Sequence, residues 1–93
     1  MTASGALART VTIVNLRGLH ARAAAKFVKT AGQFDAQVTV AKQDTEVSGL
    51  SIMGLMMLAA GKGTAIEIRA SGAEARAALD ALAMLIASKF DED

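Results

Sequence analysis

The chain has 93 residues, one histidine, no cysteine and a formal net charge of +1 at pH 7. This length fits a single domain with one core and is too short for two. The small net charge argues against a dedicated nucleic-acid-binding protein, because such proteins are strongly basic. One histidine and no cysteine exclude disulfides and leave too few ligands for a zinc-type site, so we expect no bound metal.

Both ends of the chain and its most apolar stretch bear on where the protein works. The first nine residues lack the basic start and the apolar run of a signal peptide. The most apolar run, residues 50–60, is too short to span a bilayer. We therefore expect a cytoplasmic protein without membrane insertion, in which residues 1–93 form one domain. We expect a flexible leader over residues 1–8 and a frayed acidic tail over residues 90–93.

The hydrophobic pattern alternates between strand and helix periods along the chain. Alternating apolar and polar residues predict strands over 9–14, 36–42, 46–48 and 64–70. Helical spacing predicts one helix that starts at Ala21 and stops at Gly32, and a second over 52–60. A third is expected after residues 71–74, where Ser71 and Glu74 have capping-box spacing. The inward side of the third helix would carry four aliphatic residues, Leu79, Leu82, Leu85 and Ile86.

The resulting element order is β-α-β-β-α-β-α, and it contains two strand–helix–strand crossovers. Such crossovers are typical of an α+β fold in which all helices pack on one face of a single four-stranded sheet. With only 3% aromatic residues and 53% hydrophobic residues, the core must be built mainly from aliphatic side chains.

The only histidine, His20, lies at the predicted junction between the first strand and the first helix. A glycine turn precedes it, and strong helix formers follow from Ala21 onward. The first N–H groups of a helix have no partner inside the helix, and the positive end of the helix dipole attracts anions. Arg22 adds a planar guanidinium that suits phosphate. These residues predict a side chain that accepts, holds and releases a phosphoryl group.

The first predicted helix separates an apolar stripe from a basic one. Arg22, Lys26 and Lys29 recur at i, i+4 and i+7. A solvated helix face is the simplest interpretation of such a stripe. Because the stripe begins beside His20, we interpret it as a surface that steers an acidic partner.

The second predicted helix carries more apolar residues than one buried stripe can use. Ser51 is a suitable N-cap and Gly61 a suitable stop. Leu55, Leu58 and Ala59 would face the core, while three further apolar residues fall outside that stripe: Ile52, Met53 and Met56. Either this helix is more deeply buried than its pattern indicates, or these residues form an exposed partner surface.

Two separated motifs and one loop resemble segments of the HPr family, the phosphocarriers of the bacterial phosphotransferase system. The run Gly-Leu-His-Ala-Arg-Ala-Ala over 18–24 is similar to the family's active-site signature. Ser-Ile-Met-Gly over 51–54 is similar to its regulatory-serine segment, and Gly-Lys-Gly over 61–63 to the loop before its last strand. The resemblance extends over nearly the whole chain, and the pattern resembles alphaproteobacterial members.

The resemblance implies an open-faced sandwich with an antiparallel sheet of strand order 1-4-2-3 and three helices on one side. It implies that His20 takes a phosphoryl group on Nδ1 from phospho-enzyme I, itself charged by phosphoenolpyruvate, and passes it to an enzyme IIA. It also implies that Arg22 interacts with that phosphate and that HPr kinase/phosphorylase phosphorylates Ser51. The family usually has proline where this chain has Ala23, and Arg17 replaces a small polar residue in the turn.

We therefore expect a phosphocarrier that acts as a co-substrate, not as a turnover enzyme, and that needs no cofactor. The expected phosphate cradle comprises Arg17, Ala21, Arg22 and Ala23. The expected partner-binding surface comprises Ala25, Lys26, Lys29, Ile52, Met53 and Met56. We expect a monomer, because a carrier must present its site to successive partners.

Three alternatives remain at this point. The first is a carrier of the nitrogen-type phosphotransferase branch, with a paralogous enzyme I and a regulatory enzyme IIA. The second is a regulatory binding module that acts through the Ser51 surface. The third, an enzyme that uses His20 as a general base, lacks a carboxylate to orient the ring, because no Asp or Glu lies within ten residues of His20.

Overall fold

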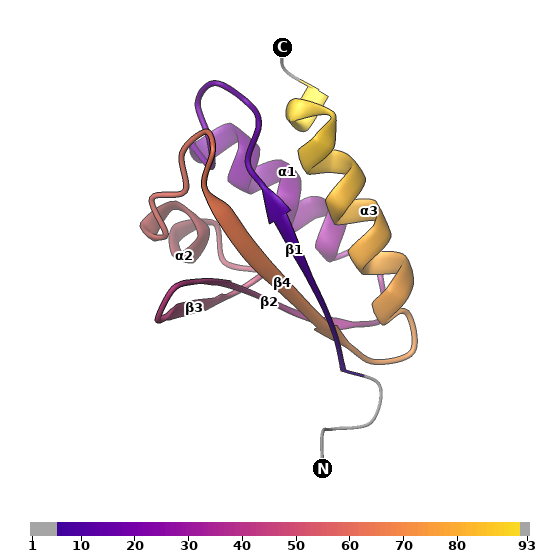
Figure 1. The fold of residues 1–93 in the computed structure, drawn as a ribbon. Helices are drawn as coiled ribbons and strands as arrows, with labels where there is room; N and C mark the ends of the chain where they lie inside the picture. Colours follow the sequence, from indigo (N-terminus) through magenta and orange to yellow (C-terminus); the bar gives the residue numbers. More distant parts are fainter. Residues whose placement is uncertain (1–5, 92–93) are drawn as a thin grey trace.

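The computed structural model describes residues 6–91, in which four antiparallel strands form one open sheet. The strands lie in the order β1 (Leu7–Thr12), β4 (Ala65–Ser71), β2 (Gln37–Lys42) and β3 (Thr45–Ser48). Three helices cover one face of this sheet, as Figure 1 shows: α1 (Ala21–Ala31), α2 (Ile52–Met57) and α3 (Ala75–Ala87). The predicted fold class, element order and strand order are therefore confirmed.

A single aliphatic core lies between the sheet and the helices. In the sheet, Val11 of β1 faces Ile66 of β4, and Val40 of β2 faces Ile68. From the helices, Phe27 of α1 and Leu82 of α3 are fully buried against these strands. The helix periodicity explains this packing, because side chains three and four positions apart share one face of a helix.

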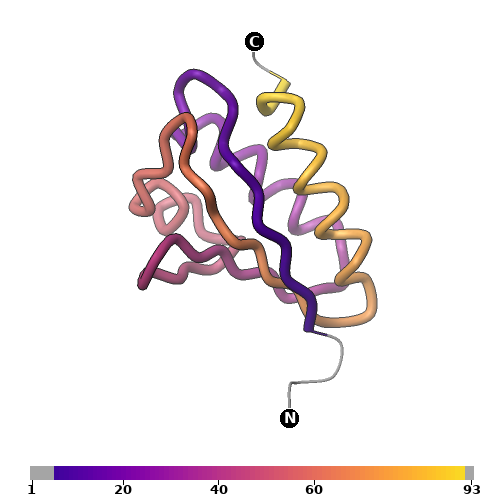
Figure 2. Tube along the Cα trace, viewed as in Figure 1, coloured from indigo at the N-terminus to yellow at the C-terminus, as the bar shows by residue number. Residues whose placement is uncertain are grey.

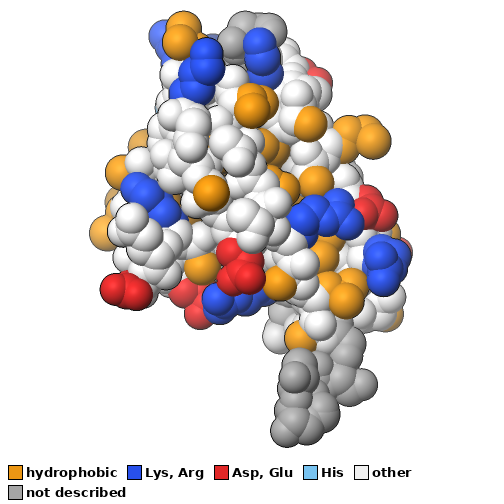
Figure 3. Space-filling model, in the orientation of Figure 1, with side chains coloured by type: hydrophobic (Ala, Val, Ile, Leu, Met, Phe, Trp, Pro, Cys, Tyr) orange, Lys and Arg blue, Asp and Glu red, His pale blue; other side chains and the backbone are white. Residues whose placement is uncertain are grey.

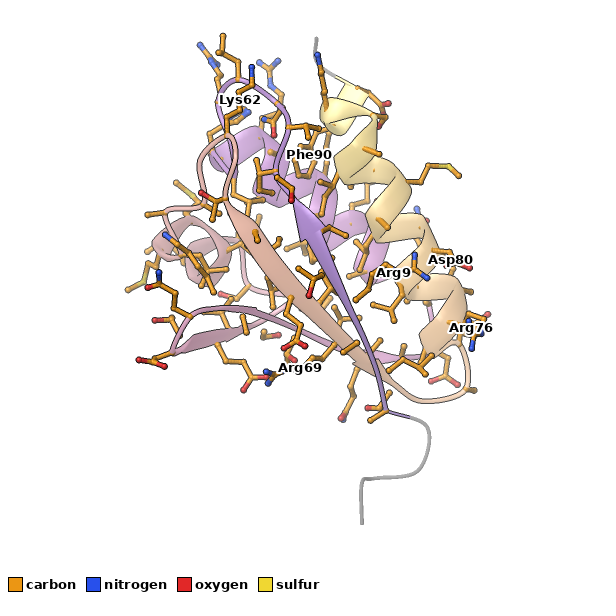
Figure 4. All side chains as sticks on the ribbon, in the orientation of Figure 1. Arg9, Lys62, Arg69, Arg76, Asp80 and Phe90 are labelled. Atoms are coloured by element: carbon orange, nitrogen blue, oxygen red, sulfur yellow. The ribbon has the colours of Figure 1, made fainter. Side chains whose placement is uncertain are left out.

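The uncovered face of the sheet carries short polar side chains and a small ion network. Arg69 of β4 donates to Glu67 (Nε–Oε1, 2.8 Å) and to Glu46 of β3 (Nη1–Oε2, 3.0 Å). Hydrogen bonding to Glu67, and then its negative charge, raise the pKa of the Arg69 guanidinium above its usual value. Figure 4 places Arg69 far from the end of the molecule that carries Lys62.

Parts of the predicted leader and of the predicted tail belong to the folded structure. Leu7 and Ala8 belong to β1 and lie opposite Ala70 and Arg69, because the alternating pattern extends further toward the N-terminus. At the other end Phe90 is fully buried, so the predicted frayed tail over 90–93 is wrong at its start. Residues 1–5 and 92–93 of these predicted segments lie outside the described residues.

One predicted helix end and one predicted helix cap are also wrong. α2 ends at Met57 and not at Ala60, and Ala59 is exposed with a left-handed φ of 53°, so it does not face the core. Lys42 provides hydrogen bonds to two carbonyl groups that follow α2. Its Nζ donates to the carbonyl oxygens of Leu58 (3.0 Å) and Ala59 (3.3 Å). α3 starts after Glu74, whose carboxylate accepts from the Asp35 N–H at 2.7 Å, so the predicted capping box does not form.

The short segment η1 (Lys89–Asp91) follows α3 and is hydrogen-bonded to α1. Its three residues all have left-handed backbone, with φ of 59°, 55° and 60°. Nζ of Lys26 donates to the Phe90 carbonyl oxygen at 2.6 Å. This contact joins the end of α3 to the helix that follows the histidine.

Candidate functional site

The turn between β1 and α1 is held in place by the backbone of the segment that precedes β4. Gly18 has φ of +66°, and a Cβ added there would lie 2.4 Å from the Ala60 carbonyl oxygen. The same oxygen accepts from the Leu19 N–H at 2.9 Å. Asn15 is buried and its Nδ2 donates to the Gly18 carbonyl oxygen at 2.9 Å. Glycine is required because only a residue without Cβ permits both this φ and this approach.

A second pair of bonds ties the end of β1 to the same segment. The Ile13 N–H donates to the Thr64 carbonyl oxygen (2.9 Å), and the Gly63 N–H donates to the Ile13 carbonyl oxygen (2.7 Å). The traces in Figure 2 show the β1–α1 turn and the segment before β4 side by side at one end of the molecule. The histidine therefore follows a turn whose position is set by main-chain contacts and not by mobile side chains.

His20 is the N-cap residue of α1, with extended backbone (φ −76°, ψ −179°). The first backbone bond of the helix runs from the Ala24 N–H to the His20 carbonyl oxygen at 2.8 Å. The N–H groups of Ala21, Arg22 and Ala23 precede this bond at the positive end of the helix dipole. The imidazole, half-buried, thus sits where backbone donors and the helix dipole favour an anion.

The four predicted cradle residues differ in the solvent exposure of their side chains. Ala21, Arg22 and Arg17 are exposed, whereas the Ala23 side chain is fully buried in the core. Ala23 can therefore contribute only its backbone N–H. Alanine fits this position because it is a strong helix former and small enough to pack under the helix start.

Positive charge gathers at this end of the molecule. Figure 3 shows Lys and Arg side chains at the end that carries the β1–α1 turn and the segment before β4. Figure 4 places Lys62 there, at the tip of the loop whose backbone holds the turn. Lys62 was not among the predicted site residues, although its place between two glycines in a loop was a usable signal.

Ser51 caps α2, as its sequence position predicted. Its Oγ accepts from the Gly54 N–H at 2.9 Å, and the residue is half-buried. A Cβ added at Gly54 would lie 3.1 Å from this Oγ and 3.0 Å from Cβ of Val47. Gly54 therefore keeps space around the hydroxyl, and the capping bond leaves the Ser51 O–H hydrogen available to another group.

The apolar excess of the second helix is exposed, which excludes the deeper burial that its pattern had left open. Met53 is 71% exposed, while Ile52 and Met56 are 40% and 41% exposed. Leu55 on the opposite side of the helix is fully buried. The structure adds two residues that the pattern had not singled out, so the α2 apolar patch comprises Leu50, Ile52, Met53, Met56 and Met57.

The predicted docking surface therefore has neighbouring parts on two helices that contact each other. α1 contributes the exposed Ala25 and Lys29, and α2 contributes its apolar patch. Lys26 is half-buried and already bonded to the Phe90 carbonyl oxygen, so less of its charge faces an incoming partner than the helical spacing suggested. Leu50 reaches toward the end of α1 near Gly32, which links the two parts.

Other kinds of site find no support in the described part of the chain. Residues 6–91 contain no group of three or more His, Cys, Asp or Glu side chains placed to hold a metal ion. None of the helices within these residues has the length and apolar character needed to cross a bilayer.

Comparison with known proteins agrees with the geometry of this turn. Residues 7–88 match the family model described as PTS HPr component phosphorylation site. The chain belongs to the HPr family. It is therefore a phosphocarrier of the phosphotransferase system, and HPr proteins carry a phosphoryl group without being turnover enzymes.

Similar HPr proteins come from several bacteria. The phosphocarrier protein HPr of Neisseria meningitidis is 52% identical over 86 residues, which cover 92% of this chain and 97% of that protein. HPr of Pseudomonas putida is 55% identical over 86 residues, which cover 91% of this chain and 96% of the relative. A phosphocarrier protein named NPr, from Shewanella violacea, is 46% identical and covers 92% and 94%. The alphaproteobacterial character stays a prediction.

Solved structures agree on the fold. The crystal structure of HPr-C-His from Thermoanaerobacter tengcongensis has a TM-score of 0.89 and 42% identity, and covers 94% of this chain and 98% of that chain. HPr of Bacillus anthracis has a TM-score of 0.84 and 40% identity, with 87% and 96% covered. The β-α-β-β-α-β-α order and the one-sided helix layer are thus those of HPr proteins.

Proposed function

We propose that His20 accepts a phosphoryl group from phospho-enzyme I and passes it to an enzyme IIA. The observation that carries this proposal is the position of His20 at the start of α1, directly before three N–H groups that precede the first helical bond. A carrier must also resist hydrolysis. Residues 10–30 contain no Asp or Glu, so no carboxylate close to His20 in the sequence can serve as a base that activates water.

The transfer exchanges one phosphorus–nitrogen bond for another. A ring nitrogen of His20, Nδ1 by analogy with the family, attacks the phosphorus in line while the bond to the donor's histidine breaks. The displaced donor imidazole leaves with the electron pair. The phosphoryl oxygens then lie near the N–H groups of Ala21 and Arg22 and near the Arg22 guanidinium. Alignment and charge stabilisation supply most of the catalysis in such transfers.

Arg22 is the side chain on which charge stabilisation chiefly depends, with Arg17 adding potential from the turn. Arg22→Ala should lower the rate of transfer from phospho-enzyme I roughly tenfold or more, because one charge-assisted contact to the transferred group is lost. Arg76→Ala is the matched control, since Arg76 is an exposed arginine of α3 far from Lys62 in Figure 4. Equal rates for both variants would remove Arg22 from the site.

Partner proteins dock on the exposed face of α1 and the α2 apolar patch. An apolar centre with a charged rim is typical of protein interfaces, and Lys29 with Arg17 supplies a basic rim for acidic partners. Enzyme I and the enzyme IIA use this surface in turn, which favours a monomeric carrier. The proposed place of this exchange is the cytoplasm. Because Lys26 bonds to Phe90, it contributes to this surface less than Lys29.

Ser51 is the proposed target of HPr kinase/phosphorylase. Its O–H can be phosphorylated while the Gly54 N–H remains as a donor to the phosphate at the start of α2. The added charge of about −2 would then lie beside the α2 apolar patch and oppose the docking of acidic enzyme I. Ser51→Asp should raise the KM of enzyme I for this carrier, whereas Ala77→Asp, an exposed control on α3, should leave it unchanged.

A nitrogen-type branch is the second candidate, and the similarity to the NPr protein of Shewanella violacea supports it. The two branches differ in their enzyme I. Comparing kcat/KM for phosphorylation by a sugar-type and by a nitrogen-type enzyme I would assign the carrier to the branch with the higher value. A regulatory module working only through Ser51 requires no transfer by either enzyme.

The direct test is incubation with phosphoenolpyruvate and a cognate enzyme I, followed by intact mass and acid treatment. The proposal predicts one added phosphate that acid removes, present in Ser51→Ala and absent from His20→Ala. A folded protein that acquires no acid-labile phosphate would contradict the proposal and favour the regulatory module.

A further inference from the structure

Methionine is unusually concentrated in α2. Three of the five methionines of the chain lie within this six-residue helix, at positions 53, 56 and 57. The chain has no cysteine, tryptophan or tyrosine. Thiols and thioethers are the protein groups that two-electron oxidants attack most readily. The methionine sulfurs are therefore the preferred target of such an oxidant in this protein.

The exposure of these methionines follows the helix period. Met53 and Met57 are one turn apart and share a face, with 71% and 77% of their surface exposed. Met56, at the edge of that face, is 41% exposed, and Leu55 on the opposite side is fully buried. An oxidant can reach the sulfurs of Met53 and Met57 without any opening of the fold.

We propose that Met53 and Met57 form an oxidation site that weakens partner docking when it is modified. The sulfur lone pair attacks one oxygen of a peroxide, the O–O bond breaks, and that oxygen remains on sulfur as a sulfoxide. The other oxygen leaves as water after taking up a proton. The sulfur loses two electrons and the peroxide gains them. A thiol-dependent reductase reverses the step by forming a disulfide and water.

This inference rests on the proposed docking role of the α2 apolar patch. A sulfoxide is polar and accepts hydrogen bonds, so burying it in an apolar contact leaves that oxygen without its water. His20 and its backbone donors are not altered by the reaction. The expected effect is therefore on the KM for the carrier and not on the rate of transfer at saturation.

Met84 provides an internal comparison. It is 72% exposed, and it lies on α3 beside Thr30, Leu85 and Ser88, away from the α2 apolar patch. Its sulfur should oxidise about as readily as those of Met53 and Met57. Because it lies outside the proposed docking surface, its sulfoxide should leave docking unchanged.

The experiment uses the full chain, treated with dilute hydrogen peroxide, freed of peroxide, and mapped by peptide mass. A melting curve confirms that the oxidised protein remains folded. The KM of enzyme I should be roughly tenfold higher for the oxidised carrier than for the unoxidised carrier. A tenfold change in KM corresponds to the loss of about one good apolar contact. Met84→Leu should show the same rise, whereas Met53→Leu/Met57→Leu should change little from its own unoxidised KM.

Two results would overturn the inference alone: an unchanged KM after Met53 and Met57 are shown to be oxidised, or an equal rise in the double leucine variant. In either case normal phosphorylation of His20 would leave the proposed function intact. Failure of the unoxidised protein to accept phosphate at all would overturn the proposed function, and the oxidation switch with it.

Discussion

Gly18→Ala tests how closely the histidine turn depends on main-chain contact with the segment before β4. Gly18 has φ of +66°, and the new Cβ would lie 2.4 Å from the Ala60 oxygen and 2.7 Å from the Gly61 Cα. Both neighbours are backbone atoms, so no side chain can rotate away to make room. The turn must move as a unit, which would break the bond from the Leu19 N–H to Ala60.

The magnitude follows from these two effects. A left-handed φ costs a residue with Cβ about 1–2 kcal/mol, and overlap with packed backbone adds about 1–3 kcal/mol. Gly18→Ala should therefore lower the free energy of unfolding by roughly 3 kcal/mol. Gly63→Ala is a matched control, because φ there is +89° but nothing lies within 4 Å of the added Cβ. It should cost only the backbone strain, about 1–2 kcal/mol.

Urea unfolding gives the stability of both variants, and the rate of transfer from phospho-enzyme I gives the position of His20. A displacement of about 1 Å lowers a transfer rate roughly a hundredfold. We expect such a loss in Gly18→Ala under conditions where the variant is folded, and near-normal transfer in Gly63→Ala. Equal destabilisation of the two variants, together with normal transfer by Gly18→Ala, would refute the view that this contact positions the site.

Three further predictions concern stability and are checked by urea unfolding. Phe90→Ala should lower the free energy of unfolding by about 3–5 kcal/mol, because this fully buried ring fills the core at the end of α3; a change below 1 kcal/mol would mean that the tail is frayed after all. Ser51→Ala should cost about 1 kcal/mol through loss of the cap to the Gly54 N–H, and no change would argue against that bond. Ala59→Gly should stabilise the protein by about 1 kcal/mol, since it relieves the left-handed φ of 53°; a loss of stability would contradict the assigned backbone.

Local patterns were sufficient to predict the sheet, the helices and the histidine turn. The alternation around Val11 and the helical spacing around Phe27 depend on neighbours a few residues apart, and the structure keeps both. The Gly-Leu-His order likewise encodes its own geometry, because a glycine was needed at the turn and a helix former after the histidine. Such features are visible in a single sequence, because the residues that encode them lie close together in the chain.

Contacts between distant segments could not be predicted in the same way. The Ala60 carbonyl oxygen that holds Leu19 and the Phe90 carbonyl oxygen that holds Lys26 lie far away in the sequence. The capping box at Ser71 failed for the same reason, because the Glu74 carboxylate found the Asp35 N–H instead. Backbone donors and acceptors carry no residue-specific signal, so the end of α2, the cap of α3 and the start of the predicted tail were the least accurate parts of the prediction.

A phosphocarrier holds the phosphoryl group on its histidine, here His20, only in passage between two proteins. The decisive measurement is a chase, in which the carrier labelled from phosphoenolpyruvate is separated from enzyme I and mixed with a purified enzyme IIA. We expect the acid-labile label to leave His20 and appear on the enzyme IIA within the mixing time, with little release as free phosphate. A label that stays on the carrier, or that is lost only to water, would contradict the role of a phosphocarrier.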